Sequence, residues 1–411
     1  MKDTIAKIEA REILSGTGRP TVEVKLETSK GVEVRASVPS GSSKGEYEAF
    51  ELHDGGTRFR GFGTRKAVEN VNRIVAPAIR GMDVTQQVEI DRTLIELDGT
   101  PNKSRLGGNA ILPVSVACVR AGAESLGLPI YRYLGGLMAR RIPVPLATVL
   151  AGGEHSPSEL EFEDYLLIPS GVPSFADSVE ALYNTRHILG DILRERFGPI
   201  PEVGGAFAPP LRDTRQAFEM MLTAIERAGY SGQILFGLDV AASALYIKDD
   251  DLYRLPAREV KAEELTDYYA ALAKDYPLVF IEDPFHQDDY YHFARLTALL
   301  PDKMIVGDDL FVSDPKRLAR GIREKAANMI LLKINQIGTV SEACEAAMMA
   351  SRNQIGVTVS VRSNDTNDSF VTDLAVAIRA SQIKLGSPVR GERNSKYNRL
   401  LEIEQELMAD C

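Results

Sequence analysis

The feature that most constrains the fold is a series of six short apolar runs in the second half of the chain. Each run ends in a charged residue, and amphipathic stretches with helical spacing fill the intervals between the runs. These intervals measure from 22 to 43 residues, while one strand-plus-helix unit takes roughly 25–40 residues. The pattern predicts consecutive strands of a β/α barrel. The six terminal residues are Asp239, Glu282, Asp308, Lys333, Arg362 and Lys384.

A different pattern precedes the predicted barrel. Residues 21–28 and 32–38 alternate apolar and polar side chains around a Ser-Lys-Gly turn, which is typical of an antiparallel hairpin. From about Ala67 to Leu134, apolar residues recur three and four positions apart, which favours helices. Strands followed by helices predict a small α+β domain.

A plausible boundary lies at residues 134–145, where glycines, prolines and charges mix. We therefore predict an α/β protein of two domains. Residues 1–135 form an α+β capping domain, and residues 140–411 form the β/α barrel.

Composition excludes several classes of function. The net charge of −10 argues against nucleic acid as a partner, because phosphate contacts require a basic surface. No apolar run approaches the ~20 residues of a membrane span, and charges near the N-terminus do not fit a signal peptide; we expect a cytoplasmic protein. The scattered Cys118, Cys344 and Cys411 support neither a zinc site nor a disulfide framework.

The charged residues at the strand ends are candidates for a site. In β/α barrels the C-terminal strand ends open into one shared mouth. A single charge after a strand needs no function, because loops are solvated, but six in register do not fit that explanation. Asp239, Glu282 and Asp308 offer hard oxygen ligands without Cys or His, a set that favours Mg²⁺.

The cations that follow suit an anionic substrate. Beside a divalent metal, a lysine such as Lys333 or Lys384 is pushed toward its neutral form and can act as a base. Arg362 and Ser363 together suit a phosphate group, through a forked charge-assisted contact and a hydroxyl. The set is equipped to remove a proton α to a carboxylate with the help of metal.

Several longer motifs make the chain resemble the enolase (2-phosphoglycerate hydratase) family. The resemblance covers nearly the whole chain and implies an enolase-type barrel acting on a small phosphorylated carboxylic acid. It also implies two Mg²⁺ sites, the second dependent on substrate, and a homodimer or higher oligomer. The motifs are REILSGTGRPTVEV, VPSGSSKGEYEAFELHDGG, LDVAAS, FIEDPF, VGDDLFVSDPKRL, ILLKINQIGT and QIKLGSPVRGERNSKYNRLLEIEQEL.

The resemblance also implies roles for individual residues. The three carboxylates named above would hold the tightly bound Mg²⁺, and Lys333 would take the α-proton. Lys384 would bind the substrate carboxylate, while Arg362 and Ser363 would hold the phosphate. Ser43 would close over the substrate and help to bind the second Mg²⁺, and His155 matches an active-site histidine of the family.

Three departures from the family pattern fall on the chemistry. Residues 203–210 read VGGAFAPP and lack the family's acidic pair, Val361 stands in place of a histidine, and Glu163-Asp164 replaces a Gln-Glu pair. Asp164 keeps the carboxylate, one methylene shorter. The groups that bind metal and phosphate and remove the proton remain, whereas those that handle the departing hydroxide are lost or altered. We therefore expect an enzyme that forms the enolate but loses water slowly.

Three functions stay open at this point. The first is an enolase interconverting 2-phosphoglycerate and phosphoenolpyruvate, with Asp164 or His155 supplying the lost acid. The second is a paralogue that uses the enol(ate) against another electrophile, similar to carboxyphosphonoenolpyruvate synthase. The third is a non-catalytic relative with a binding role.

Overall fold

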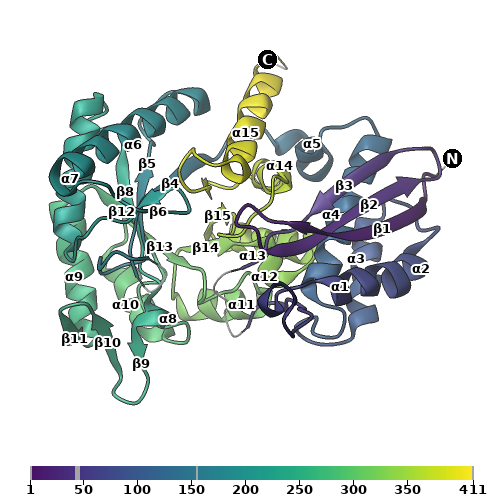
Figure 1. The fold of residues 1–411 in the computed structure, drawn as a ribbon, viewed down its shortest axis with the longest axis horizontal. Coiled ribbons are helices and arrows are strands. Elements are labelled where there is room, and N and C mark those ends of the chain that lie inside the picture. The colour runs from purple at the N-terminus through teal and green to yellow at the C-terminus, as the bar shows by residue number, and fades with distance from the viewer. Residues whose placement is uncertain (1, 42–46, 154–155, 410–411) are drawn as a thin grey trace.

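The N-terminal part of the chain is built around a small antiparallel sheet, drawn in purple in Figure 1. The computed structural model describes residues 2–41, 47–153 and 156–409. Alternate residues of the central strand, including Val22, Val24 and Leu26, are fully buried, so the predicted hairpin is confirmed. The sheet has the order β1-β2-β3 and consists of β1 (Ile5–Leu14), β2 (Pro20–Thr28) and β3 (Glu33–Ser37).

Helices follow this sheet, as the apolar spacing predicted. The longest, α4, is buried along nearly its whole length and packs on β2 and β3. The helices are η1 (Arg58–Gly61), α1 (Arg65–Asn70), the π-helix η2 (Val71–Val75), α2 (Ala76–Ile79), α3 (Gln87–Asp98), α4 (Gly108–Ser125), α5 (Ile130–Gly135) and η3 (Gly136–Met138).

The second part of the chain is a closed barrel of eight strands, which confirms the predicted fold class. Its order is β4-β5-β8-β12-β13-β14-β15-β16, and β16 pairs back with β4. Strand β5 runs antiparallel to both neighbours, and the other pairings in the barrel are parallel. The strands are β4 (Val144–Ala151), β5 (Asp164–Ile168), β8 (Leu235–Asp239), β12 (Leu278–Glu282), β13 (Met304–Gly307), β14 (Met329–Leu332), β15 (Gly356–Ser360) and β16 (Gln382–Lys384).

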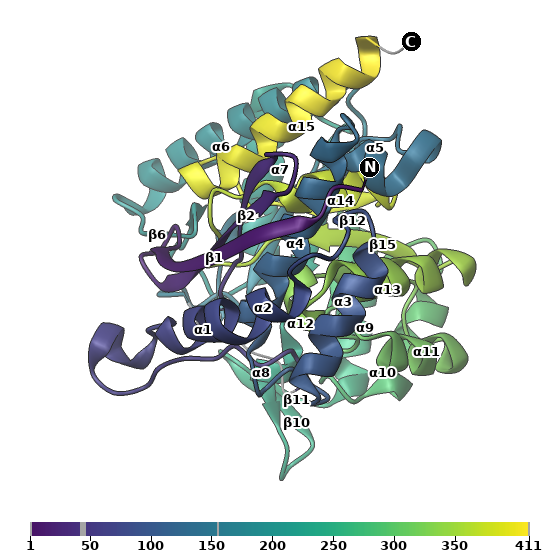
Figure 2. The ribbon, with the colours of Figure 1, turned by 90° about the vertical axis from the view of Figure 1, so that its right-hand side faces the viewer.

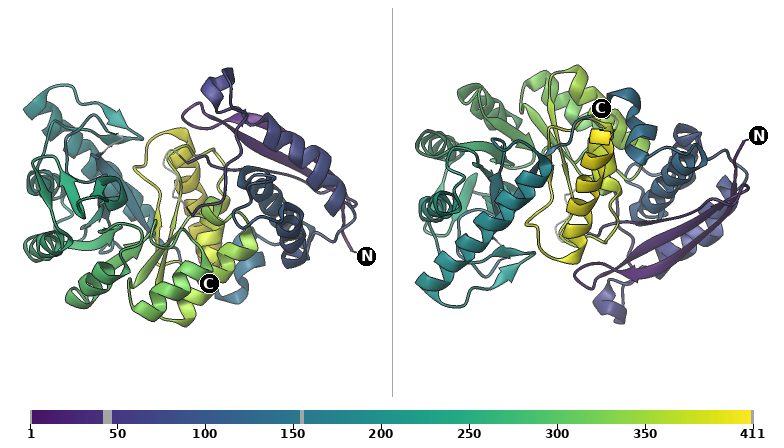
Figure 3. Two further views of the ribbon diagram at one scale, coloured as in Figure 1. Left: turned by 90° about the horizontal axis from the view of Figure 1, so that it is seen from below. Right: turned by 90° about the horizontal axis from the view of Figure 1, so that it is seen from above.

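Helices surround this barrel (Figure 3). They are α6 (Phe175–Phe197), α7 (Thr214–Ala228), α8 (Ala242–Leu245), α9 (Ala262–Asp275), α10 (Tyr290–Leu299), α11 (Pro315–Glu324), α12 (Ile334–Ile337), α13 (Val340–Arg352), α14 (Phe370–Ala377) and α15 (Gly391–Ala409). Short strands complete the fold: β6 (Glu202–Val203) and β7 (Ala206–Phe207) beside β4, and the hairpin elements β9 (Tyr246–Ile247), β10 (Leu252–Leu255) and β11 (Arg258–Val260).

The interior of the barrel explains why the charged residues gather at its mouth. Side chains two apart on a strand share a face, so Glu282 lies on the face of Phe280, and Asp308 on that of Val306. Phe280 and Val306 belong to an apolar cluster that fills the barrel. The charged groups therefore form a layer at the mouth of the barrel, next to this apolar cluster. The cluster comprises Leu146, Leu166, Ile168, Phe280, Val306, Met329 and Leu331.

The N-terminal domain packs against the barrel through α4 and the segment after β3. Figure 2 looks onto this domain and shows β1 and β2 in front of α4. Ser40 forms an isolated β-bridge with Asn364, and the Ser37 amide donates to Asp368 Oδ2 at 2.9 Å. These contacts place the segment that follows β3 at the edge of the barrel mouth. We propose the predicted division into residues 1–135 and 140–411, which this change of architecture supports.

None of the described helices is by itself both long and apolar enough to cross a membrane. Helix α4 and the segment Ile130–Met138 reach the required length and composition only as a pair, across a bend of 92°.

Candidate active site

Three of the predicted metal ligands lie side by side because their strands are neighbours. Asp239 and Glu282 end β8 and β12 and are direct partners in the parallel pairing, while Asp308 follows β13, the next strand. All three are buried, and Glu282 has no exposed surface. Burial and the charge of Asp239 raise the pKa of Glu282 well above its ordinary value. The structure thus brings together the carboxylates that the sequence predicted.

Lys384 neutralises part of this acidic group. Its Nζ lies 2.6 Å from Asp239 Oδ2, 2.8 Å from Glu282 Oε2 and 3.6 Å from Asp164 Oδ2. Burial alone would lower the pKa of Lys384, but the surrounding carboxylates outweigh burial and raise it well above its ordinary value. Lys384 is therefore a fixed cation at the centre of the mouth, suited to holding a carboxylate rather than to accepting a proton.

Lys333 directly follows β14, the strand beside β13, and forms an ion pair with Asp308 Oδ2. Gln336 Nε2 donates to the other oxygen of Asp308 at 2.7 Å. Burial works against the charge on both members of the pair, but their attraction prevails: it raises the pKa of Lys333 and lowers that of Asp308. In the protein alone Lys333 is thus protonated, and it can accept a proton only when another cation takes over Asp308.

A second group of carboxylates lies beside the first. Ligand oxygens of Asp283, Asp308 and Asp309 come within 4.8 Å of one another. Both oxygens of Asp283, however, already accept backbone amides, from Asp308 at 2.9 Å and Asp309 at 2.7 Å. We therefore interpret Asp283 as a positioning residue that fixes the loop carrying Asp308. The sequence analysis missed this role, although FIEDPF and VGDDL show the extra acids.

Glu163 and Asp164 line the same cavity as Asp239 and the two lysines. Asp164 is the first residue of β5, and Glu163 directly precedes it. The Thr148 hydroxyl donates to Asp164 Oδ2 at 3.2 Å. Burial raises the pKa of Glu163 to about 8, with the charges of Asp239 and Asp164 acting in the same direction. The pKa of Asp164 is also raised, mainly by burial. The pair thus holds a carboxyl proton at neutral pH.

This raised pKa predicts a pH-dependent cost in stability. Glu163 binds a proton in the folded chain up to about pH 8, whereas the unfolded chain releases it near 4.5, so stability falls as pH rises between these values. In EDTA, Glu163→Gln should match the wild type near pH 4.5 and exceed it at pH 9 by on the order of 3 kcal/mol. Urea unfolding at pH 4.5, 7 and 9 measures the difference, and equal stabilities at pH 9 would refute the buried proton.

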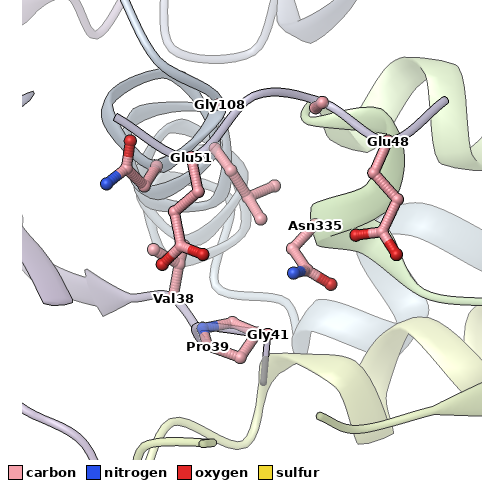
Figure 4. Close-up of a pocket in the computed structure, with 10 residues that line it drawn as sticks. Val38, Pro39, Gly41, Glu48, Glu51, Gly108 and Asn335 are labelled. Atoms are coloured by element: carbon pink, nitrogen blue, oxygen red, sulfur yellow. The ribbon is translucent and has the colours of Figure 1, made fainter. Parts of the chain in front are cut away.

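Arg362, predicted to bind phosphate, holds a carboxylate in this structure. Its Nη1 donates to Glu48 Oε2 at 2.9 Å and to Asn335 Oδ1 at 3.3 Å. Glu48 and Asn335 lie next to each other in the wall of a small cavity (Figure 4). The segment that begins at Val38 forms another part of the same wall. Glu48 lies in the motif VPSGSSKGEYEAFELHDGG, which also contains Ser43. Its contact with Arg362 therefore connects this motif of the N-terminal domain to the arginine that is predicted to bind phosphate.

The remaining predicted residues differ in how the structure places them. Ser363 is exposed and lines the main cavity beside Arg362. Ser43 and His155 lie outside the described residues, so their roles stay predictions. Glu202, the acid just before the segment that lacks the family's acidic pair, is not among the residues that line the cavity. Its carboxylate accepts a hydrogen bond from Arg186 Nη2 at 2.8 Å.

The main cavity joins these groups into one site. It has a volume of about 320 Å³ and is lined by Glu163, Asp164, Asp239, Lys333, Arg362, Ser363 and Lys384. The same cavity reaches Val361, which is only 6% exposed, and Gly204, at the positions where the family's acid groups are missing. The arginines Arg390 and Arg393 also line it. The sequence analysis missed both, although the motif SPVRGER contains them.

Comparison with known proteins assigns the family. The family model "Enolase, C-terminal TIM barrel domain" matches residues 139–411, and "Enolase, N-terminal domain" matches residues 5–134. The chain belongs to the enolase family. It is 52% identical over 409 residues to the enolase of Methanopyrus kandleri, covering 98% of this chain and 96% of the relative.

Other enolases are similar over the same extent. The enolase of Methanothrix thermoacetophila is 50% identical over 406 residues, with 98% of this chain and 96% of the relative covered. The enolase of Pyrococcus furiosus is 49% identical over 409 residues, with 98% and 95% covered. The likeness to enolases thus extends through both the N-terminal domain and the barrel, and the resemblance noted in the sequence motifs is confirmed.

Proposed function

We propose that this chain is a phosphopyruvate hydratase, a lyase that interconverts 2-phosphoglycerate and phosphoenolpyruvate. The observation that carries the proposal is a single cavity lined by Lys333, Lys384, Arg362 and Asp239. Glu282 and Asp308, at the ends of the next two strands, form ion pairs with the two lysines of that cavity. Enolases that match the whole chain at about 50% identity support the same reaction. They do not favour the paralogue with another electrophile or the non-catalytic relative.

The carboxylates fit a divalent cation. Glu282 Oε1 is buried and has no hydrogen-bond partner among the described residues, so it offers a free ligand oxygen next to Asp239. A buried carboxylate oxygen without a partner is costly, and a cation would remove that cost. We infer that Asp239, Glu282 and Asp308 hold Mg²⁺. A second Mg²⁺, arriving with the substrate and assisted by Ser43, is a further proposal from the family resemblance.

The residues of the chain divide the work on the substrate. Lys384 holds the substrate carboxylate, and Arg362, with Ser363, holds the phosphate after Glu48 yields its contact. Asp239, Glu282 and Asp308 would hold the metal, whose positive charge would stabilise the negative charge that develops on the substrate carboxylate. With Asp308 engaged as a ligand, Lys333 would lose its ion pair and could accept a proton. Lys333 then takes the α-proton. The carboxyl pair Glu163–Asp164, which lines the same cavity and holds a proton, supplies the acid for the leaving hydroxide. In the proposal Asp164 or His155 completes that transfer.

The test follows proton removal and loss of water separately. The protein is incubated in D₂O with Mg²⁺ and 2-phosphoglycerate, and NMR records both loss of the α-proton and formation of phosphoenolpyruvate. We expect both, with exchange of the α-proton faster than elimination because the family's acid groups are missing. Exchange without any phosphoenolpyruvate would support the paralogue, and neither event, with Mg²⁺ bound, would support a binding role.

The proposed metal site predicts the effect of changing Glu282. Glu282→Gln keeps the size of the side chain but replaces a charged ligand oxygen, so affinity for Mg²⁺ should fall by about 100-fold or more. Mg²⁺ titration by calorimetry measures this without turnover. Glu263→Gln, which changes an exposed acid on α9 that does not line the cavity, serves as the control and should leave affinity unchanged. Unaltered affinity in Glu282→Gln would place the metal elsewhere.

Two further parts of the proposal rest on the sequence alone. A homodimer is what the family resemblance implies, and a cytoplasmic location is what the N-terminal sequence predicts. The partner that the site supports is a small phosphorylated carboxylic acid.

A further inference from the structure

A buried arginine faces the cavity, and no carboxylate among the described residues is its partner. Arg393, in the first turn of α15, is 9% exposed and lines the cavity beside Gly204 and Gly386. Its Nη1 donates to the Leu385 carbonyl at 3.0 Å. Its Nε is buried and has no hydrogen-bond partner in the described part of the chain.

The other buried arginines are paired. Among the described residues three arginines are buried, and Arg186 and Arg362 each form an ion pair, with Glu202 at 2.8 Å and Glu48 at 2.9 Å. No acidic side chain in the described ranges pairs with Arg393. A buried charge is stable when an opposite charge and hydrogen bonds accompany it. The site therefore lacks an anion at Arg393.

The backbone leaves this guanidinium accessible from the cavity. Gly204 has φ of +59°, and a Cβ built there would lie 3.9 Å from Arg393 Nη2. A glycine at this point leaves the edge of the guanidinium uncovered. The wall around it is formed by small or apolar side chains, Ala206 and Val361. Asp164, which lines the same cavity, is already engaged by Thr148 and Lys384.

The substrate's own geometry identifies what faces this wall. The α-carbon of 2-phosphoglycerate carries four substituents. In the proposed reaction its carboxylate lies at Lys384, its phosphate at Arg362 and its proton at Lys333. The fourth substituent, the methylene, is left to the wall formed by Gly204, Val361 and Arg393.

We propose that Arg393 is a second carboxylate-binding group, so that the site takes phosphorylated acids with an additional carboxylate on this methylene. The inference rests on the proposed function, because that function places the other substituents. A guanidinium and a carboxylate form charge-assisted hydrogen bonds that are stronger than neutral ones. The site should thus bind a phosphorylated acid with this second carboxylate more tightly than the analogue that lacks it.

Two analogues that differ by one carboxylate test the subsite. In 2-phospholactate the methylene position is a methyl group, and in 2-phosphomalate it carries a carboxylate; neither has a hydroxyl there, so neither can lose water. Calorimetry with Mg²⁺ should show that the wild type binds 2-phosphomalate at least about tenfold more tightly, the contribution of one charge-assisted hydrogen bond. Equal or weaker affinity for 2-phosphomalate in the wild type overturns the proposal.

Variants connect this preference to one residue. Arg393→Met should bring the affinity ratio close to one and leave 2-phospholactate binding within about twofold, while Arg393→Lys should keep part of the preference. Arg390→Met is the matched control, because Arg390 lines the same cavity but its Nε lies 2.7 Å from Glu392. An equal loss in Arg390→Met would show a general effect of charge and refute the assignment to Arg393.

The outcomes are separate from those of the proposed reaction. A preference for 2-phosphomalate in a protein that does not turn over 2-phosphoglycerate would refute the proposed reaction and support the carboxylate subsite at Arg393. Turnover of 2-phosphoglycerate without a preference for 2-phosphomalate would support the reaction and refute the subsite. If Arg393→Met does not fold, the wild-type ratio and the Arg393→Lys variant still decide.

Discussion

Lys333→Ala should abolish exchange of the α-proton of 2-phosphoglycerate, with a rate loss of at least about 10²–10⁴-fold, the contribution of a positioned general base. Lys333 reaches Asp308 from the end of β14 and lines the cavity. The other lysine of the cavity, Lys384, is held by Asp239 and Glu282 and is assigned to the substrate carboxylate. NMR in D₂O with Mg²⁺ measures the exchange rate directly. Mg²⁺ affinity, measured in parallel, shows whether the carboxylates still bind metal in the variant.

An arginine at the same position separates base from charge. Lys333→Arg keeps a cation beside Asp308, but arginine stays protonated and cannot accept a proton. It should therefore be as inactive in exchange as Lys333→Ala. Persistent exchange in either variant would show that Lys333 is not the base, and exchange in Lys333→Arg alone would show that it acts only through its charge.

Much of the barrel could be predicted because its strands are buried on both faces. Parallel strands covered by helices read as continuous apolar runs, and all six runs chosen from the sequence are barrel strands. The reversed direction of β5 could not be predicted, because the apolar run DYLLI gives no indication of whether the strand pairs parallel or antiparallel to its neighbours. Its direction depends on the connection from Ala151 to Asp164, where the described residues form no crossover helix of the kind that parallel neighbours require.

The strand-end residues of the site were predictable for the same reason, since the barrel brings successive strand ends to one mouth. The contacts among them were not. Glu48 meets Arg362 across 314 positions of sequence, through docking of the N-terminal domain on the barrel. The role of Asp283 depends on a backbone with φ of +42°, which aims its carboxylate at two amides. Arg393 stands out only in the folded structure, where no acidic side chain of the described ranges pairs with it.

Val361→His should increase the rate of phosphoenolpyruvate formation by about 10²-fold, the lower range for general acid catalysis, and leave α-proton exchange unchanged. Val361 lines the cavity, and its amide donates to the Lys384 carbonyl at 3.2 Å, so an imidazole there would face the substrate's methylene. An unperturbed histidine has a pKa near 6.5, and the neighbouring cations lower it. The gain should therefore be greatest below about pH 6, where the histidine carries its proton.

Val361→Phe is the matched control, because phenylalanine has a ring of similar size but no proton to give. An equal gain in Val361→Phe would trace the effect to packing. No gain in Val361→His, with exchange intact, would mean that proton supply does not limit the loss of hydroxide. In that case the carboxyl pair Glu163–Asp164 already provides the proton. Glu163→Gln, which removes an ionisable carboxyl from that pair, should then slow elimination while exchange continues, so the two variants together locate the acid.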